Sequence, residues 1–339
     1  MNPFIAAQIH ALNENIHLLE AFVTTPVELS SEIHLLRESL PVVDTGELPQ
    51  LERQQRHLAY QGLTAQPLRL ALKAATQIYD VLGTLTSLRD SEGLILRTEW
   101  VSHTERVIAR VLQQVGRELR SEATSRIRGL YVIIDPDVTA GRSTLEIASA
   151  AIEGGAQVLQ YRDKTRDAID VLPEALKMRA LCQTHDVLFI MNDNPALAAA
   201  SEADGLHVGQ RDLPVREARR SLGWEQLVGR SNNSMKEISE SMATGADYLA
   251  VGTVFPTSTM GKSTRPIVGP ELITQTKLIT DQPVVAIGGL NTSNVAQVVA
   301  AGANCVCVVG AVTLSANPLR STEALVEAIE NAKNHQSDR

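Results

Sequence analysis

Residues 189–214, FIMNDNPALAAASEADGLHVGQRDLP, contain two short apolar runs that are each followed by an aspartate. Phe189–Met191 has the composition of a buried strand, and Asp193 follows it after one intervening residue. The run from 205 to 209 has the same character, and Asp212 comes three residues later. Strands that are buried on both faces are nearly continuous apolar runs. We therefore interpret both runs as buried strands, each presenting a carboxylate just past its carboxyl end.

The same pattern continues outward through the second half of the chain, where short β-branched runs alternate with helix-length segments. Each parallel return in a sheet needs a crossover, so this alternation predicts a parallel sheet. Eight such units favour a (β/α)8 TIM barrel. A doubly wound open sheet is the alternative, but no G-x-G-x-x-G follows the first run. The runs are LYVIID (130–135), QVLQYRDK (157–164), VLFIMND (187–193), GLHVGQ (205–210), LVGRSN (227–232), YLAVGTVF (248–255), VVAIGGL (284–290) and CVCVVGAV (305–312).

The first part of the chain has a different period. Apolar residues there recur at intervals of three and four, which indicates amphipathic helices. These stripes cover residues 5–19, 27–40, 68–88 and 101–119. The sequence therefore predicts an all-α helical domain of unknown role over residues 1–127 and a barrel domain over residues 128–339.

The bulk composition limits the classes of partner. The 339 residues carry a net charge of −8, and only 3% of them are aromatic. Both values argue against binding to nucleic acid or to an anionic membrane surface. No run is long and apolar enough to span a membrane, and the first twenty residues contain no Lys or Arg, unlike a secretory signal. Three cysteines suit a reducing compartment, so we expect a cytoplasmic protein.

The segment QYRDK carries the first candidate site. If residues alternate along the strand, Gln160 and Arg162 share one side, and Lys164 continues that parity just past the strand end. A guanidinium and an ammonium group close together can clamp a phosphate or a diphosphate. The alternative is that Arg162 and Lys164 are solvent-exposed residues at a strand end, which is the commoner situation for such residues.

Asp193 and Asp212 form the second candidate site, because the carboxyl ends of neighbouring strands lie close together on one face of a barrel. Mg²⁺ commonly takes one or two carboxylates and completes its coordination shell with water and substrate phosphates. The pair facing a basic clamp therefore predicts a Mg²⁺–diphosphate site. In the alternative, Asp193 begins a turn before Asn194 and Pro195, and Asp212 caps the next helix.

Three further strand ends indicate a second anion site. The segment 255–263 offers hydroxyl groups, amides and Lys262, while 286–290 and 308–312 contain glycines that let backbone amides approach a phosphate. Tight turns that need positive φ would explain the glycines equally. His207 could act as a general base, but we favour a ring that fills space inside the barrel.

Taken in order, the segments LYVIID, QYRDK, MNDNPALA, ADGLHVGQRDLP, VGRSNNS, GADYLAVGTVFPTST, PVVAIGGL and VVGAV closely resemble the thiamine-phosphate synthase family. The resemblance covers residues 129–332 and leaves residues 1–127 outside. It implies a barrel that joins a hydroxymethylpyrimidine diphosphate to a thiazole phosphate and releases pyrophosphate, with Mg²⁺ as cofactor.

The resemblance also implies site residues. Pyrimidine diphosphate contacts fall on Gln160, Tyr161, Arg162, Asp163, Lys164, Asn192 and Ser231, Mg²⁺ ligands on Asp193 and Asp212, and thiazole phosphate contacts on Thr257, Ser258, Thr259, Gly289, Val309 and Gly310. Arg162, Lys164, Ser231 and Lys262 are the expected catalytic group. The chain departs from the family at Met260, where a lysine is usual, and at Gly310, where serine is common. Lys262 is the candidate to replace that lysine.

The implied mechanism is dissociative: the diphosphate leaves first, and the thiazole nitrogen then attacks the pyrimidine cation. This chemistry needs electrostatics and positioning, and no side-chain nucleophile. Two alternatives stay open, a thiazole tautomerase-like enzyme and a non-catalytic regulator that binds thiazole phosphate. Barrels of this family are often homodimers, although the sequence identifies no interface.

Overall fold

A computed structural model describes residues 3–23, 27–38, 67–87, 98–257 and 266–337. The chain divides into two compact units, residues 1–119 and residues 120–339. Among the described residues no helix has both the length and the apolar character needed to cross a membrane.

The first unit is helical, as predicted. It contains α1 (Pro3–Phe22), α2 (Val27–Glu38), α4 (Pro67–Ser87) and most of α5 (Thr98–Ser125). The predicted stripe of α1 is buried, with Ile5, Ile9 and Leu12 each at most 2% exposed. α1 packs along α4 and against α2, so the apolar stripes are buried against one another.

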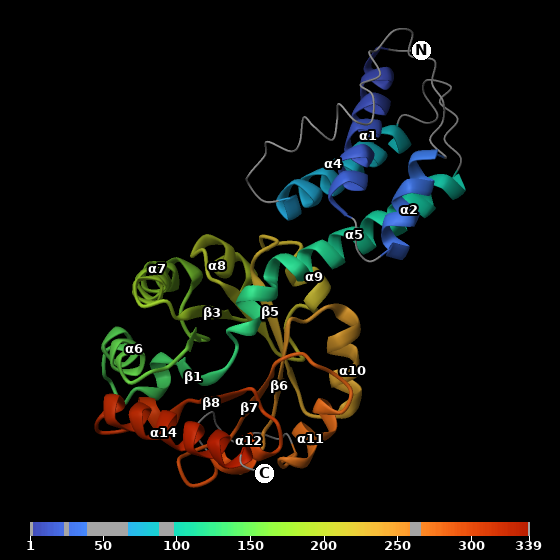
Figure 1. The fold of residues 1–339 in the computed structure, drawn as a ribbon. Helices are drawn as coiled ribbons and strands as arrows, with labels where there is room; N and C mark the ends of the chain where they lie inside the picture. Colours follow the sequence, from blue (N-terminus) through green and yellow to red (C-terminus); the bar gives the residue numbers. More distant parts are fainter. Residues whose placement is uncertain (1–2, 24–26, 39–66, 88–97, 258–265, 338–339) are drawn as a thin grey trace. The chain divides into compact units, whose positions relative to one another are not determined.

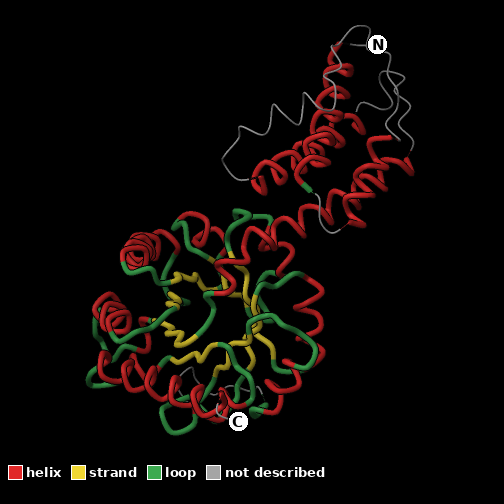
Figure 2. The backbone as a smooth tube through the Cα atoms, viewed as in Figure 1, coloured by secondary structure: helices red, strands yellow, loops and turns green. Residues whose placement is uncertain are grey.

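The second unit is a closed barrel of eight parallel strands, which confirms the predicted fold class (Figure 1, Figure 2). The strands pair in chain order, and β8 pairs with β1 to close the ring. They are β1 (Gly129–Ile134), β2 (Val158–Tyr161), β3 (Leu188–Asn192), β4 (Gly205–Val208), β5 (Leu227–Asn232), β6 (Tyr248–Val251), β7 (Val284–Ile287) and β8 (Cys305–Val308).

Helices surround the ring of strands, as the tube in Figure 2 shows. A short 3-10 helix, η1 (Pro136–Val138), follows β1. The α-helices are α6 (Thr144–Glu153), α7 (Ala168–Thr184), α8 (Pro195–Ala200), α9 (Val215–Arg219), α10 (Met235–Thr244), α11 (Glu271–Lys277), α12 (Val295–Ala300), α13 (Gly310–Thr313) and α14 (Pro318–Ser337).

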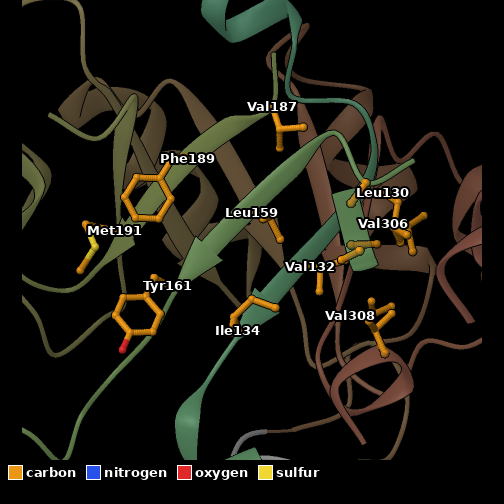
Figure 3. Packing of buried hydrophobic residues seen from close by; sticks show 14 of the residues in the cluster. Leu130, Val132, Ile134, Leu159, Tyr161, Val187, Phe189, Met191, Val306 and Val308 are labelled. Carbon is orange, nitrogen blue, oxygen red and sulfur yellow. The ribbon is translucent and has the colours of Figure 1, made fainter. Parts of the chain in front are cut away.

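Alternation along each strand divides the barrel core into two layers. Outward residues such as Leu159, Tyr161 and Phe189 pack beneath the helices, as Figure 3 shows. Inward residues fill the barrel, among them Tyr131, Ile190 and Tyr248. Cys305 and Cys307 both belong to this inner layer, in agreement with their spacing of two.

Residues 120–127 belong to the barrel unit although they precede its first strand. Arg120, in the last turns of α5, is buried and donates from Nε to Asp247 Oδ1 at 2.9 Å. Ile127 is 1% exposed and packs with the inner layer. The predicted domain boundary at 127/128 therefore lies eight residues after the boundary between the two compact units.

Candidate functional site

A cavity of about 410 Å³ opens at the carboxyl ends of the strands. Gln160 and Arg162 reach it from β2 and its end, and Ser231 reaches it from β5. The predicted site residues that line it are Gln160, Arg162, Lys164, Asn192, Asp193, Asp212, Ser231, Thr257, Gly289, Val309 and Gly310. Residues from strands far apart in sequence thus share one space, as the barrel prediction requires.

The position of Asp193 follows from its backbone. Its N–H donates to the carbonyl of His207 on β4 at 2.8 Å, and its φ of +59° lies in the left-handed region that Asp tolerates better than most residues. Asp212 is held by the amide of Gly209, which donates to its Oδ2 at 2.7 Å. Both carboxyl groups therefore lie at the end of β4.

The two carboxyl groups are close enough to hydrogen bond with each other, and their pKa values diverge. Burial, followed by the neighbouring Asp212 carboxyl, raises the pKa of Asp193 against the opposing effect of Lys164. For Asp212, burial raises the pKa, but the hydrogen bonds from Asp193 and from the Gly209 amide outweigh it and leave the pKa lowered. The Asp212 carboxyl group therefore makes a charged Asp193 less favourable, and a cation bound between the two groups would remove that effect.

The donor set suits Mg²⁺. Among the residues that the structure describes, no three His, Cys, Asp or Glu side chains gather into a metal cluster. Mg²⁺ does not need such a cluster, because one or two carboxylates, water and substrate phosphate oxygens make its usual shell. Asp193 and Asp212 supply two carboxylates beside an open cavity.

The two basic side chains of the clamp each contact a carboxylate. Lys164 Nζ lies 2.5 Å from Asp193 Oδ2. Arg162 is ion-paired with Asp135, which is 2% exposed and also accepts from the amide of Asp137 to cap η1. Asp135 therefore orients Arg162 toward the cavity. The sequence pattern did not predict this role for Asp135, although Asp135 ends the run LYVIID as Asp193 ends the run VLFIMND.

Tyr161 and Asp163, two of the predicted substrate contacts, have side chains outside the cavity lining. Tyr161 points into the outer layer beneath the helices (Figure 3). Asp163 accepts from the amides of Thr165 and Arg166 at 3.0 Å and pairs with the Arg166 side chain. The cause is the alternation itself, since residues 161 and 163 have the opposite parity to Gln160 and Arg162.

The side chain of His207 lies inside the barrel and lines the cavity. Its Nε2 lies 2.9 Å from Ser231 Oγ, and its Nδ1 lies 3.1 Å from Tyr248 Oη. Burial lowers the pKa of His207 to about 4, so the ring is neutral at physiological pH. Burial likewise raises the pKa of Tyr131 and Tyr248 well above 10, which keeps their hydroxyl groups protonated.

The opposite side of the cavity is formed by backbone. Gly289 has a φ of +67°, and a Cβ there would lie 2.5 Å from the carbonyl oxygen of Pro256. The loops after β6 and β7 therefore approach more closely than a side chain would allow. Val309 and Gly310 lie at the start of α13, and Thr257 completes this side. Ser258, Thr259, Met260 and Lys262 lie outside the described residues.

The family model for thiamine monophosphate synthase matches residues 130–312. A thiamine-phosphate synthase of Persephonella marina is 39% identical over 202 residues, which are 60% of this chain and 96% of that protein. One of Thermosynechococcus vestitus is 40% identical over 204 residues, 60% of this chain and 56% of that longer protein.

A solved structure agrees with these matches. It is a thiamine phosphate pyrophosphorylase from Pyrococcus furiosus, 30% identical, and it aligns with a TM-score of 0.56. The alignment covers 62% of this chain and 98% of that one. The matched part is the barrel, while the helical unit lies outside the family match.

Proposed function

The chain belongs to the thiamine monophosphate synthase family, and we propose how the cavity at the ends of its strands carries out the reaction of that family. The enzyme is a transferase of thiamine biosynthesis. It condenses 4-amino-2-methyl-5-(diphosphooxymethyl)pyrimidine with 4-methyl-5-(2-phosphooxyethyl)thiazole to give thiamine phosphate and pyrophosphate.

The diphosphate binds on the side of the cavity formed by β2, β3 and β4. Arg162 offers a planar pair of N–H donors, and Lys164 offers a point charge. Asp193 and Asp212 would hold Mg²⁺, which would supply further positive charge beside the diphosphate. As the C–O bond breaks, Arg162 and Lys164 stabilise the negative charge that moves onto the departing pyrophosphate.

The thiazole phosphate binds on the opposite side, where Gly289, Val309 and Gly310 bring backbone amides to the cavity. Thr257 adds a hydroxyl group, and Ser258 and Thr259, the next two residues of the sequence, are further proposed contacts that lie outside the described residues. Two anions held on opposite sides would place the thiazole nitrogen toward the pyrimidine carbon that it attacks. No side-chain nucleophile is required, so Lys262 enters this scheme only as a further cation for the diphosphate.

One observation carries this proposal: a single cavity contains both carboxylates, both cations and the glycine-lined backbone. A thiazole tautomerase-like enzyme or a binding regulator would need only the glycine side. Neither would use two carboxylates held beside a lysine.

The test is pyrophosphate release by the purified chain. We expect release only when both substrates and Mg²⁺ are present, and we expect a chelator to abolish it reversibly. Isomerisation of the thiazole phosphate alone would establish the tautomerase instead. Tight binding of thiazole phosphate without any pyrophosphate release would establish the regulator.

We also propose a homodimer in the cytoplasm. The three cysteines are buried free thiols, which supports a reducing compartment. The dimer rests on resemblance alone, and light scattering on the purified chain tests it directly.

A further inference from the structure

Gln160 and Ser231 both line the cavity, but they come from β2 and β5, which are separated in the barrel by β3 and β4. Two buried side chains, Tyr131 and Tyr248, and His207, which also lines the cavity, join them. Gln160 Nε2 donates to Tyr131 Oη at 2.8 Å, and Tyr131 Oη lies 3.3 Å from Tyr248 Oη. Tyr248 Oη lies 3.1 Å from His207 Nδ1, and His207 Nε2 lies 2.9 Å from Ser231 Oγ. Four hydrogen bonds therefore run from one cavity residue to the other.

The barrel makes room for this chain of hydrogen bonds. Gly229 on β5 leaves space for the ring of Tyr248, because a Cβ at that position would lie 2.0 Å from Tyr248 Cζ. The rings of Tyr131 and Tyr248 are at most 1% exposed, with centroids 6.5 Å apart. The ring of His207 stacks on that of Tyr248, with the ring centroids 5.7 Å apart. Phenylalanine would fill the same volume without forming these bonds, so packing alone does not account for the two hydroxyl groups.

Every member of the chain between its ends can give one hydrogen bond and receive one. A hydroxyl group does so by rotation, and a neutral imidazole carries one N–H and one bare nitrogen. For every hydrogen of the chain to be paired, the bonds must all run in the same direction. With Gln160 Nε2 donating to Tyr131, this arrangement points the hydroxyl hydrogens toward His207 and has His207 Nε2–H donate to Ser231. Gln160 Oε1 then remains as an acceptor for a ligand, and the Ser231 hydroxyl as a donor.

We propose that Tyr131, Tyr248 and His207 are positioning residues that couple the orientation of Gln160 to that of Ser231, and so select an aminopyrimidine over an oxopyrimidine. The inference rests on the function proposed above. An exocyclic amino group is a donor and needs the oxygen of Gln160. An oxo group is an acceptor and would need Gln160 Nε2, which reverses every bond and turns the Ser231 hydroxyl back toward His207. The oxo compound would then lose the Ser231 donor.

Breaking the chain in the middle tests this coupling. Tyr248→Phe removes a hydroxyl group that touches neither Gln160 nor Ser231, and it keeps the ring above Gly229. Dissociation constants are measured by calorimetry, without thiazole phosphate, for the pyrimidine diphosphate and for its analogue with oxo in place of amino. We expect the unmodified chain to prefer the amino compound, and we expect Tyr248→Phe to reduce that preference about tenfold, roughly the contribution of one hydrogen bond.

A matched control deletes a buried hydroxyl elsewhere. Thr276 on α11 is fully buried, and its hydroxyl group donates to the Leu272 carbonyl at 2.6 Å, away from the cavity. Thr276→Val should leave the preference unchanged. Tyr131→Phe breaks the next bond of the chain and serves as a second variant if Tyr248→Phe does not fold. It should reduce the preference in the same direction.

Two results would overturn the coupling. One is an equal weakening of both ligands in Tyr248→Phe or Tyr131→Phe, which would mean that the hydroxyl groups only support packing. The other is an equal change of preference in Thr276→Val. Failure of the proposed function is seen separately, because the unmodified chain would then release no pyrophosphate from its two substrates.

Discussion

At the residue scale, Asp193 combines an uncommon backbone conformation with a carboxyl group close to another one. Its φ of +59° is uncommon for a residue with a side chain, and its carboxyl group lies beside that of Asp212. Both features disfavour the ion-free protein with a charged Asp193. A role in cation binding would explain both features, because a bound cation would remove the repulsion between the two carboxyl groups.

The first prediction separates catalysis from stability at this residue. Asp193→Asn should lower kcat about 100-fold to 1000-fold, as the loss of a preorganised electrostatic group commonly does, and should raise the Mg²⁺ concentration needed for half-maximal rate. The folded-state pKa of Asp193 is raised, so any stabilisation from this group is present at low pH and lost as pH rises through that pKa. At pH 7 without Mg²⁺, the variant should therefore melt no lower than the unmodified chain.

The control for this prediction is Asp170→Asn, which removes an exposed carboxylate from the first turn of α7. Its kcat and Mg²⁺ dependence should match those of the unmodified chain. An Asp193→Asn enzyme with normal Mg²⁺ dependence would remove this residue from the metal site.

Which residues reach the cavity was largely predictable from parity, and the exceptions are informative. Spacing of two placed Gln160 and Arg162 together, and both line the cavity. Tyr161 and Asp163 came from a family segment taken as a whole, and the same parity directs their side chains outward. Asp135 needed a contact with Arg162, 27 residues later, that no local pattern contains.

At the element scale, the sequence predicted all eight strands but extended most of them too far. The runs 157–164 and 248–255 were each predicted as one strand, while β2 ends at Tyr161 and β6 ends at Val251. Some of the excess residues line the cavity, such as Arg162 and Lys164 after β2 and Gly252 and Thr253 after β6. Their composition does not mark where strand pairing stops.

The loop between β2 and α7 illustrates how such a segment is held. Arg166 donates to Asp163 at 2.6 Å and to Glu174 on α7 at 2.7 Å, and it also contacts the Tyr161 hydroxyl. These bonds tie the loop to the outer layer. Lys164 lies in the middle of the tied segment, with its ammonium group at Asp193.

The second prediction concerns this loop. Arg166→Met keeps much of the side-chain volume but removes the bonds to Asp163 and Glu174, so Lys164 should lose its fixed position. We expect KM for the pyrimidine diphosphate to rise about tenfold, the scale of one charge-assisted hydrogen bond, with little change in KM for thiazole phosphate. Steady-state kinetics with each substrate varied in turn measures both values.

Arg179→Met is the matched control, because Arg179 is also ion-paired but lies near the carboxyl end of α7, with Asp204. Unchanged kinetics in Arg166→Met would show that the loop does not need this tie.

At the scale of the whole molecule, the predicted boundary at 127/128 depended on where the apolar pattern changes. The polar stretch 120–128 has the composition of a linker, so composition alone would assign it to a region outside the barrel. Its partners lie far along the sequence: Arg120 bonds to Asp247, 127 residues later. Asp247 is buried and also pairs with Arg219 at 2.5 Å. Both arginine partners of this carboxylate are distant in sequence, so a local sequence pattern could not predict the pairing.

The last prediction compares two shortened chains, one beginning at residue 116 and one at residue 128. Both lack nearly all of the helical unit, but only the first keeps Arg120 and Ile127. Removing one partner of a buried ion pair and a fully buried isoleucine should destabilise the barrel by about 3 kcal/mol or more. For a domain of this size that corresponds to a Tm lower by about 6 °C or more. Thermal unfolding of the two chains measures the difference, and pyrophosphate release reports whether each cavity still works. Because the relative from Persephonella marina matches the barrel over 96% of its length, we expect the chain from residue 116 to remain active. Equal melting temperatures would instead place the start of the barrel domain at residue 128 and make residues 120–127 a linker.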